Sequence, residues 1–359
     1  MRVCILGKNL TSLTLAKALV NKDIHVDLFF SKIKKNINHS RTLGISKSNV
    51  EFVNKHVVNI ENILWKLNKI EIFTDKLKHE KILNFEDNKD QLFSIVKNDR
   101  FCDLIEKKLS KEKNFKYKIY NNKNLSLVHK YELIINCDFK NDITKKFFSK
   151  NIQKKYDSFA YTTIINHEKV VNNTATQIFT KQGPLAYLPI SNVQTSVVYS
   201  VHNNSKNKKD NIRNLILKYN SKYKIKNISE IECFELNSSN LRSYYYKNII
   251  AFGDLLHRVH PLAGQGFNMT LRDIKILLEI VQEKSNLGLP IDDNIGFDFE
   301  KKTKNKNFVF LSGIDFVHEF FNLERKISNN FLSKSLQYLG RNNSINKFFT
   351  QIADEGTLF

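Results

Sequence analysis

Residues 249–273 read IIAFGDLLHRVHPLAGQGFNMTLRD and carry the most specific pattern in the chain. A short apolar run predicts a strand that ends at Gly253-Asp254, so one carboxylate lies at the tip of the strand. A loop with His260-Pro261 follows, and Gly264-Gln265-Gly266-x-Asn268 then opens an apolar pattern at helical spacing. Glycines let the backbone approach a ligand, and the first turn of a helix offers free N–H groups to a negative atom. The segment therefore predicts a site for a large anionic ligand.

This segment resembles the second flavin motif of single-component FAD-dependent aromatic hydroxylases, and its spacing is closest to that of the ubiquinone-biosynthesis hydroxylases. The resemblance implies that Asp254 binds the ribityl chain of FAD. It also implies that Pro261 and the Gly-Gln-Gly backbone lie against the flavin ring. The cofactor-binding residues predicted here are Gly253, Asp254, Pro261, Gly264, Gln265, Gly266 and Asn268.

Residues 2–31 predict a strand, a tight turn, a helix and a second strand, which is the βαβ unit that opens dinucleotide-binding folds. Only Gly7 remains of the three expected glycines, because Asn9 and Ser12 stand at the other two positions. Asn tolerates left-handed backbone and Ser is small, so the turn can still form. The acid expected at the end of the second strand is replaced by Phe30, which cannot accept a hydrogen bond from ribose. Taken alone, this unit indicates a plain βαβ start as much as a nucleotide site.

Two further segments resemble cofactor-binding parts of the same family. Arg41 begins an Arg-Thr-Leu-x-Ile-Ser pattern, whose arginine lies beside the flavin diphosphate in the family, and a guanidinium suits phosphate geometry. Asp138 stands where the family has an Asp-Gly pair near the pyrophosphate, although Phe139 replaces the glycine. Lys97 stands where the family usually has an acid or an amide. The predicted contacts on this side of the cofactor are Gly7, Asn9, Ser12, Arg41 and Asp138.

The segment 156–246 has strand patterns interrupted by one helix near 212–219, which predicts an antiparallel sheet inserted before the Gly-Asp motif. We therefore predict an α/β fold. Its Rossmann-like FAD domain is discontinuous (1–72, 91–150 and 247–290), its substrate domain covers 73–90 and 151–246, and its C-terminal region 291–359 is helical. The run 183–189 resembles the family strand that roofs the substrate pocket, so Tyr187, Leu188 and Pro189 are predicted to line the substrate. A core strand with a proline at each end is the alternative.

The chain has 359 residues and a formal net charge of +21. Lysine and asparagine recur throughout, and aromatic residues do not interleave with the basic runs, so we expect no nucleic-acid partner. Four widely spaced cysteines indicate reduced thiols and no metal site. No apolar run reaches the ~18–20 residues of a spanning helix. The chain begins directly on a strand, so we expect a cytoplasmic protein without a signal peptide. A lipidic substrate favours a peripheral position at the inner face of the membrane.

The resemblance implies an FAD-dependent monooxygenase that hydroxylates the aromatic ring of a polyprenylated phenol in ubiquinone biosynthesis. FAD, reduced by NADPH or another reductant, would react with dioxygen to give a flavin hydroperoxide. The cofactor carries this chemistry, and the protein positions the ring and excludes water. His260 and Pro261 are the candidate ring-side residues, although the histidines of this loop, His257 and His260, are more often structural. Other quinone-biosynthesis proteins and the membrane surface are the further partners implied.

Two other interpretations remain open. A flavin enzyme of the same fold would act on a soluble aromatic acid, through a closed pocket with an arginine for the carboxylate, or would reduce isoprenoid double bonds. A non-catalytic or weakly FAD-binding scaffold in the biosynthetic assembly would explain the changes at Asn9, Ser12, Phe30 and Phe139. We expect the ring end of the site to keep its geometry and the adenine end to bind loosely.

Overall fold

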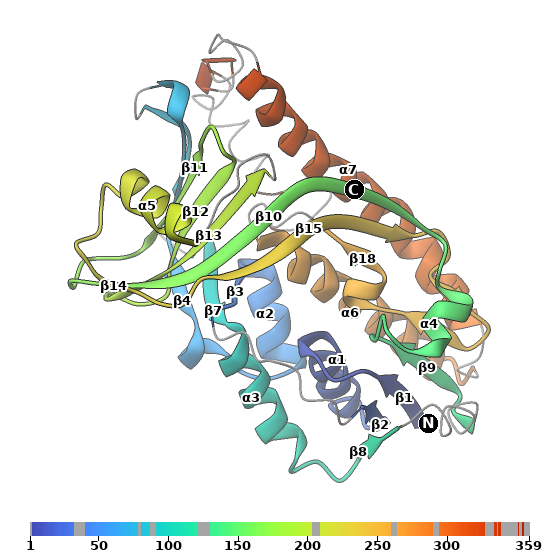
Figure 1. The fold of residues 1–359 in the computed structure, drawn as a ribbon. Helices are drawn as coiled ribbons and strands as arrows, with labels where there is room; N and C mark the ends of the chain where they lie inside the picture. Colours follow the sequence, from blue (N-terminus) through green and yellow to red (C-terminus); the bar gives the residue numbers. More distant parts are fainter. Residues whose placement is uncertain are drawn as a thin grey trace.

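The computed structural model describes residues 2–31, 40–77, 80–86, 91–120, 130–202, 209–259, 264–289 and 294–326, together with residues 334, 335, 337, 338, 351 and 354. Two large sheets lie at opposite ends of the molecule, and a long C-terminal helix runs along one side of both (Figure 1). This arrangement confirms the predicted α/β fold with a dinucleotide-binding sheet and an added, mostly antiparallel sheet.

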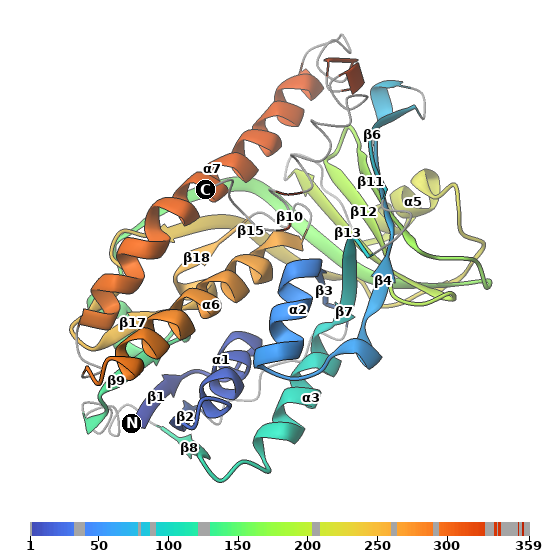
Figure 2. The ribbon, with the colours of Figure 1, turned by 180° about the vertical axis from the view of Figure 1, so that it is seen from behind.

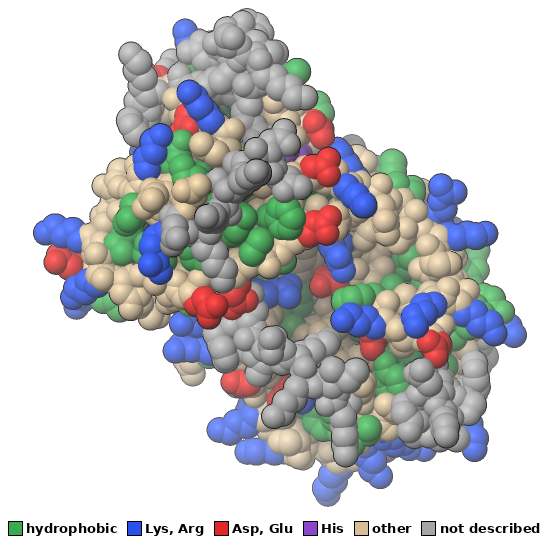
Figure 3. Space-filling view, in the orientation of Figure 1, with side chains coloured by type: hydrophobic (Ala, Val, Ile, Leu, Met, Phe, Trp, Pro, Cys, Tyr) green, Lys and Arg blue, Asp and Glu red, His purple; other side chains and the backbone are tan. Residues whose placement is uncertain are grey.

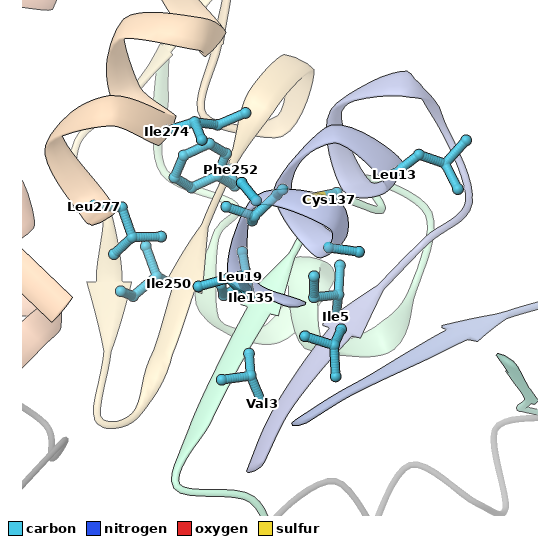
Figure 4. Packing of buried hydrophobic residues seen from close by; sticks show 14 of the residues in the cluster. Val3, Ile5, Leu13, Leu19, Ile135, Cys137, Ile250, Phe252, Ile274 and Leu277 are labelled. Atoms are coloured by element: carbon cyan, nitrogen blue, oxygen red, sulfur yellow. The ribbon is translucent and has the colours of Figure 1, made fainter. Parts of the chain in front are cut away.

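The first sheet has the strand order β16-β17-β9-β1-β2-β8. Neighbouring strands pair in parallel, except β16 with β17. Helix α1 packs over these strands. Its apolar side chains are buried in one cluster with those of β9, β17 and α6 (Figure 4). Parallel sheets are covered on both faces, which explains their nearly continuous apolar strands. The elements are β1 (Arg2–Leu6), α1 (Leu10–Val20), β2 (His25–Phe30), β8 (Phe115–Ile119), β9 (Leu133–Asn136), β16 (Tyr245–Tyr246) and β17 (Ile249–Ala251).

The second sheet follows the order β18-β15-β10-β13-β12-β11-β5-β6, and β14 pairs with β10. Most of its pairs are antiparallel, and β11 with β5 is parallel. Helix α5 (Lys209–Tyr219) covers one face through a separate apolar cluster. The strands are β5 (Lys69–Thr74), β6 (Lys81–Glu86), β10 (Asn151–His167), β11 (Thr174–Phe179), β12 (Pro184–Pro189), β13 (Gln194–His202), β14 (Ile225–Ile228), β15 (Glu232–Leu241) and β18 (His257–Arg258).

A small third sheet and the remaining helices connect the two large sheets. The sheet has the order β3-β7-β4, with both pairs antiparallel. Viewed from behind, α6 lies between α2 and α7 (Figure 2). The elements are β3 (Thr42–Ser46), α2 (Lys47–His56), β4 (Trp65–Leu67), β7 (Phe93–Lys97), α3 (Asn98–Leu109), α4 (Asp142–Phe147), α6 (Gln265–Asn286) and α7 (Asn294–Lys326), with short 3₁₀ turns at Glu61–Ile63, Asp75–Leu77 and Gly253–Leu255.

Some details differ from the sequence-based expectation. The chain enters the second sheet at Lys69, four residues before the expected boundary at 73, because β5 pairs along its whole length with β11. Strand β18, which lies inside the Gly-Asp motif, pairs with β15 and so anchors this motif to the second sheet. None of the helices in the described ranges is long and apolar enough to cross a membrane.

Candidate flavin site

The Gly253-Asp254 pair follows β17 and lies against the first turn of α1. Gly253 has a φ of +65°, and a Cβ added to it would lie 2.7 Å from Thr11 Cγ2. Glycine therefore lets the end of β17 rest on the first turn of α1. Asp254, which follows it, is exposed, and its carboxylate makes no hydrogen bond to any described residue. The sheet thus delivers an unpaired carboxylate to the carboxyl ends of its strands, where open α/β sheets bind ligands.

Gly264 forms the second part of the site. It has a φ of +64° and precedes α6, and a Cβ added to it would lie 3.3 Å from the backbone nitrogen of Gly44 in β3. Two backbone segments that are far apart in the sequence therefore lie in close contact. Gln265 begins α6, its side chain is buried, and its Oε1 atom has no hydrogen-bond partner among the described residues. A buried acceptor without a partner is costly unless a ligand or water satisfies it.

Asn268 ties this loop to the rest of the domain. Its Oδ1 atom accepts hydrogen bonds from the Ser46 N–H and from Asn49 Nδ2, both at 3.0 Å. Its Nδ2 atom donates to the carbonyl oxygens of Gly44 and Gly264, at 3.0 and 3.4 Å. The side chain is fully buried and all its bonds are made within the chain. The geometry thus supports a positioning role for Asn268 in place of the predicted cofactor contact.

A buried His–Asp pair supports the same loop from the other side. His257 Nε2 lies 2.5 Å from Asp273 Oδ2, and both side chains are about 1% exposed. Asn307 Nδ2 in α7 donates to the other oxygen of Asp273 at 3.1 Å. The pair therefore links β18, α6 and α7, and it supports a structural role for His257. The ring-side candidates His260 and Pro261 lie outside the described residues.

Two cations lie at one end of the third sheet. Arg41 immediately precedes β3, its side chain is exposed, and it makes no hydrogen bond or ion pair with any described residue. Lys97, paired in register with Thr42, lies 3.4 Å from Gln194 Oε1. Burial lowers the pKa of Lys97 below its usual value. The predicted contact of Arg41 with the flavin phosphates stays a prediction, and its exposed guanidinium is compatible with it.

The ring and ribityl half of FAD fits the residues of this site. Among the described residues Asp254 is exposed without a hydrogen-bond partner, Gln265 has a buried acceptor without one, and Gly264 packs closely on Gly44. The adenosine half does not fit in the same way. The turn at Asn9 and Ser12, the carboxylate of Asp138 and the end of β2 at Phe30 already bond or pack with other parts of the chain.

The central strands of the second sheet present uncharged side chains to this site, and the adjoining strand β15 places Glu232 opposite Thr162. Thr42 of β3 donates to Ser196 at 2.8 Å, which identifies the face of β13 that lies toward the first domain. The register places Leu188 opposite Ser196 and Ala186 opposite Val198, so these side chains share that face. The inward positions of the four central strands are Ala160, Thr162, Ile164, Ala175, Gln177, Phe179, Pro184, Ala186, Leu188, Ser196, Val198 and Ser200, and none is charged.

Tyr187 is a correction to the predicted substrate-lining residues. Its side chain points to the opposite face, where its hydroxyl donates to the Ile216 carbonyl of α5 at 2.7 Å. Pro189 alternates with Leu188 and falls on the same face as Tyr187. Of the three predicted residues, only Leu188 faces the first domain. The sequence missed Ala186 and Val198, because a strand that is apolar on both faces gives no period-2 signal.

Replacing Gly264 with alanine is expected to weaken flavin binding and to lower stability by about 1–2 kcal/mol, because alanine is strained at positive φ. Gly288→Ala is the matched control, since Gly288 has a φ of +65° and open space around its Cβ position. Both variants carry the backbone strain, but only Gly264→Ala intrudes on Gly44. Thermal unfolding and flavin titration of the two proteins separate these effects. Equal flavin affinities would contradict the close approach at Gly264.

Sequence comparisons agree with the resemblance. No protein-family model matches the chain. The ubiquinone biosynthesis monooxygenase COQ6 of Danio rerio is 23% identical over 233 residues, which is 53% of this chain and 48% of that protein. The ubiquinone hydroxylase UbiL of Rhodospirillum rubrum is 23% identical over 180 residues, covering 46% of this chain and 41% of UbiL. The chain thus spans about half the length of the curated relatives it matches.

Solved structures agree with the fold. The p-nitrophenol 4-monooxygenase PnpA of Pseudomonas putida superposes with a TM-score of 0.78 and 10% identity, over 98% of each chain. Klebsiella pneumoniae HpxO, complexed with FAD and uric acid, superposes with a TM-score of 0.72 and 10% identity, covering 98% of this chain and 97% of HpxO. The chain is a homologue of proteins named as ubiquinone-biosynthesis monooxygenases, and its fold is that of FAD-dependent monooxygenases.

Proposed function

We propose that this homologue of ubiquinone-biosynthesis monooxygenases is itself a flavin-dependent monooxygenase that hydroxylates the ring of a polyprenylated phenol. The observation that carries the proposal is the Gly-Asp motif. Its Gly253 rests on the first turn of α1, its Gly264 rests on Gly44, and its Asp254 is left exposed and unpaired. These features suit the ribityl chain and ring of a flavin. The proposal also draws on the names of the curated relatives.

When bound, the flavin supplies the activation of dioxygen, with electrons from NADPH or another reductant. The chain's own residues bind and orient. Asp254 accepts a hydrogen bond from the ribityl chain, and Arg41 approaches phosphate. Asn268 holds the loop of Gly264 against β3. The uncharged face of the second sheet places the substrate ring beside this loop and keeps water away from it.

The uncharged face favours a lipidic phenol over an aromatic acid. A carboxylate in a buried pocket needs a cationic or hydrogen-bonding partner, because its desolvation is costly. None of the inward residues of β10–β13 named above is charged. Purified protein, reconstituted with flavin, a reductant and a short-chain prenylphenol, tests the proposal. We expect ring hydroxylation of the prenylphenol and none of a hydroxybenzoic acid. The reverse preference would contradict the substrate class.

Phe234→Ala is expected to raise the KM for a prenylphenol about three- to tenfold, because apolar contact with the tail is lost. Phe234 is 43% exposed and lies opposite Ala160, on the same face as Val198. Leu217→Ala is the control, since Leu217 is 46% exposed but belongs to α5 on the other face. Flavin affinity should stay unchanged in both variants. Equal KM values for the two variants would remove Phe234 from the substrate path.

We also propose a peripheral position on an anionic membrane. Helix α7 exposes Phe308, Val309 and Phe316, at 54, 64 and 69% of their surface. Lys and Arg side chains are spread over the face seen in Figure 3, and the net charge is +21. Apolar side chains beside basic ones suit an anionic lipid surface. The lipidic substrate reaches the site from that surface.

Replacing Val309 and Phe316 together with serine is expected to weaken binding to phosphatidylglycerol vesicles about tenfold or more, through lost apolar burial. Vesicle co-sedimentation measures the effect. Val171→Ser is the control, because Val171 is 81% exposed and lies outside α7. A double variant that sediments like the control would show that this part of α7 does not meet the membrane.

A scaffold without flavin is the competing function. The internal bonds of Asn9 and Asp138 favour it, since they use groups that the diphosphate side would need. The spectrum of the purified protein decides between them. The protein could lack flavin absorption and gain none after incubation with either FAD or FMN. That result would contradict the proposed monooxygenase function and favour the scaffold function.

A further inference from the structure

The first turn of α1 already carries an internal substitute for a phosphate oxygen. Asn9 Oδ1 accepts the Ser12 N–H at 3.0 Å, and the Asn9 N–H donates to Ser12 Oγ at 2.9 Å. Asn9 Nδ2 also donates to the Cys137 carbonyl at 3.1 Å, which ties the turn to the end of β9. In dinucleotide-binding turns the second glycine lets the backbone approach the pyrophosphate. Here the Asn9 carboxamide fills that position and uses the N–H group that an anion would take.

Asp138, at the end of β9, is held by neighbours in the same way. Its Oδ2 atom accepts the Tyr120 hydroxyl at 2.8 Å, and its Oδ1 atom accepts the Lys140 N–H at 2.9 Å. Tyr120 follows β8, three strands away from β9 in the sheet order, and is buried. Its side chain therefore reaches across the carboxyl edge of the sheet toward Asp138. Both oxygens of this acid thus already bond to groups of the chain itself, and Tyr120 fixes the orientation of the carboxylate.

The end of β2 carries an aromatic cluster where a ribose-binding acid is expected. Phe30 meets Tyr117 edge to face, with ring centroids 5.8 Å apart. Lys8 Nζ lies 5.5 Å from the Phe30 ring and 5.0 Å from the Tyr117 ring, and it pairs with Glu106 at 3.1 Å. The cation is thus held by two rings and a carboxylate. The Phe30 side chain, which stands at the position of the expected acid, offers no acceptor to the ribose hydroxyls.

We infer that this protein binds flavin through its ring, its ribityl chain and the phosphate next to that chain, so FMN is held as tightly as FAD and the adenylate adds nothing. The inference deepens the proposed function and rests on it, because it assumes that a flavin is bound at the Gly-Asp motif. The side chains that replace the adenylate contacts are Lys8, Asn9, Phe30, Tyr117, Tyr120 and Asp138. Arg41, unpaired among the described residues, is left for the single phosphate of FMN.

The test compares FAD and FMN on the wild-type protein. Flavin-free protein is titrated with each flavin, and the shift of the flavin absorption bands reports binding without any turnover. We expect Kd values within about threefold of each other. ADP in large excess should not displace either flavin. FAD that binds about tenfold or more tightly than FMN, or ADP that displaces FAD, would overturn the inference while leaving the proposed function intact.

Two double variants test which side chains cause the equal affinity for FAD and FMN. Asn9→Gly with Phe30→Glu frees the turn and supplies a ribose acceptor, and it should bind FAD about tenfold more tightly than FMN. Asn9→Gly with Phe30→Leu frees the same turn without an acceptor, and it should show a smaller preference. Circular dichroism confirms that both are folded. If the first variant shows the same ratio of FAD affinity to FMN affinity as the wild type, the assignment of these side chains is overturned.

Absence of binding by either flavin is a separate outcome. It would overturn the proposed function, and the inference would fall with it. The three results are therefore distinguishable: equal affinities support both statements, a strong preference for FAD removes only the inference, and no binding removes both.

Discussion

Asp254→Ala is expected to lower flavin affinity about ten- to hundredfold, since a hydrogen bond to a charged group contributes about 1.5–3 kcal/mol and 1.4 kcal/mol is a factor of ten. The carboxylate lies at the end of β17, exposed and without a partner among the described residues. Its removal takes nothing from the folded chain, so the melting temperature should stay at its wild-type value. The loss falls on binding alone, and absorption titration measures it.

The design of this experiment includes two comparisons. Asp254→Asn keeps an oxygen acceptor without the charge, so its loss of affinity should lie between the wild type and Asp254→Ala. Asp142→Ala removes another exposed carboxylate, which is 53% exposed and pairs only with Lys145 across one helical turn, and it should leave flavin binding unchanged. Unaltered affinity in Asp254→Ala would move the flavin away from this motif.

Asp273→Ala should be the most destabilising of the substitutions considered, at about 3–5 kcal/mol, because it removes a buried hydrogen-bonded carboxylate and leaves its partners unsatisfied. His257 Nε2 and Asn307 Nδ2 both bond to this carboxylate, and His257 and Asp273 are about 1% exposed. Loss of Asp273 leaves two buried donors without an acceptor. The free energy of unfolding, taken from urea titration, reports the effect.

A surface acid on the neighbouring helix provides the control. Asp298 pairs with Lys284 at 3.5 Å and is 38% exposed. Exposed pairs contribute about 0–1 kcal/mol, so Asp298→Ala should change stability little. The Asp273 variant should also bind flavin less well, because β18 and α6 flank the loop of Gly264. A urea midpoint of Asp273→Ala near that of the wild type would show that the His257–Asp273 pair contributes little to stability.

Local patterns were sufficient for much of the fold. Helix α6 follows from apolar residues at helical spacing after Gly264, and the βαβ start follows from a strand, a capped turn and a helix within thirty residues. The order and spacing of Gly253, Asp254 and Gly264 predicted a site for a large anionic ligand, and the family resemblance implied that this ligand is a flavin. The structure then confirmed the two-sheet α/β fold in which this motif lies.

Residues with partners far away in the chain could not be interpreted from sequence. Asn268 carries a motif position, but its partners Ser46 and Asn49 are more than 200 residues away, and they give it a positioning role. Tyr187 lies in a strand that is apolar throughout, so only its pairing with β13 and its bond to Ile216 reveal that it faces α5.

The sequence by itself determined the strand, loop and helix that bring Asp254 and the glycines together, because spacing along one segment encodes that geometry locally, and the family resemblance predicted a flavin there. Only the tertiary structure showed which contacts are made by the residues at the predicted adenosine end of the site. The sequence showed that Asn9 and Phe30 depart from the pattern, but not what they do instead. The contacts of Asn9 with Cys137, and of Tyr120 with Asp138, arise because parallel strands bring their carboxyl ends to one edge of the sheet.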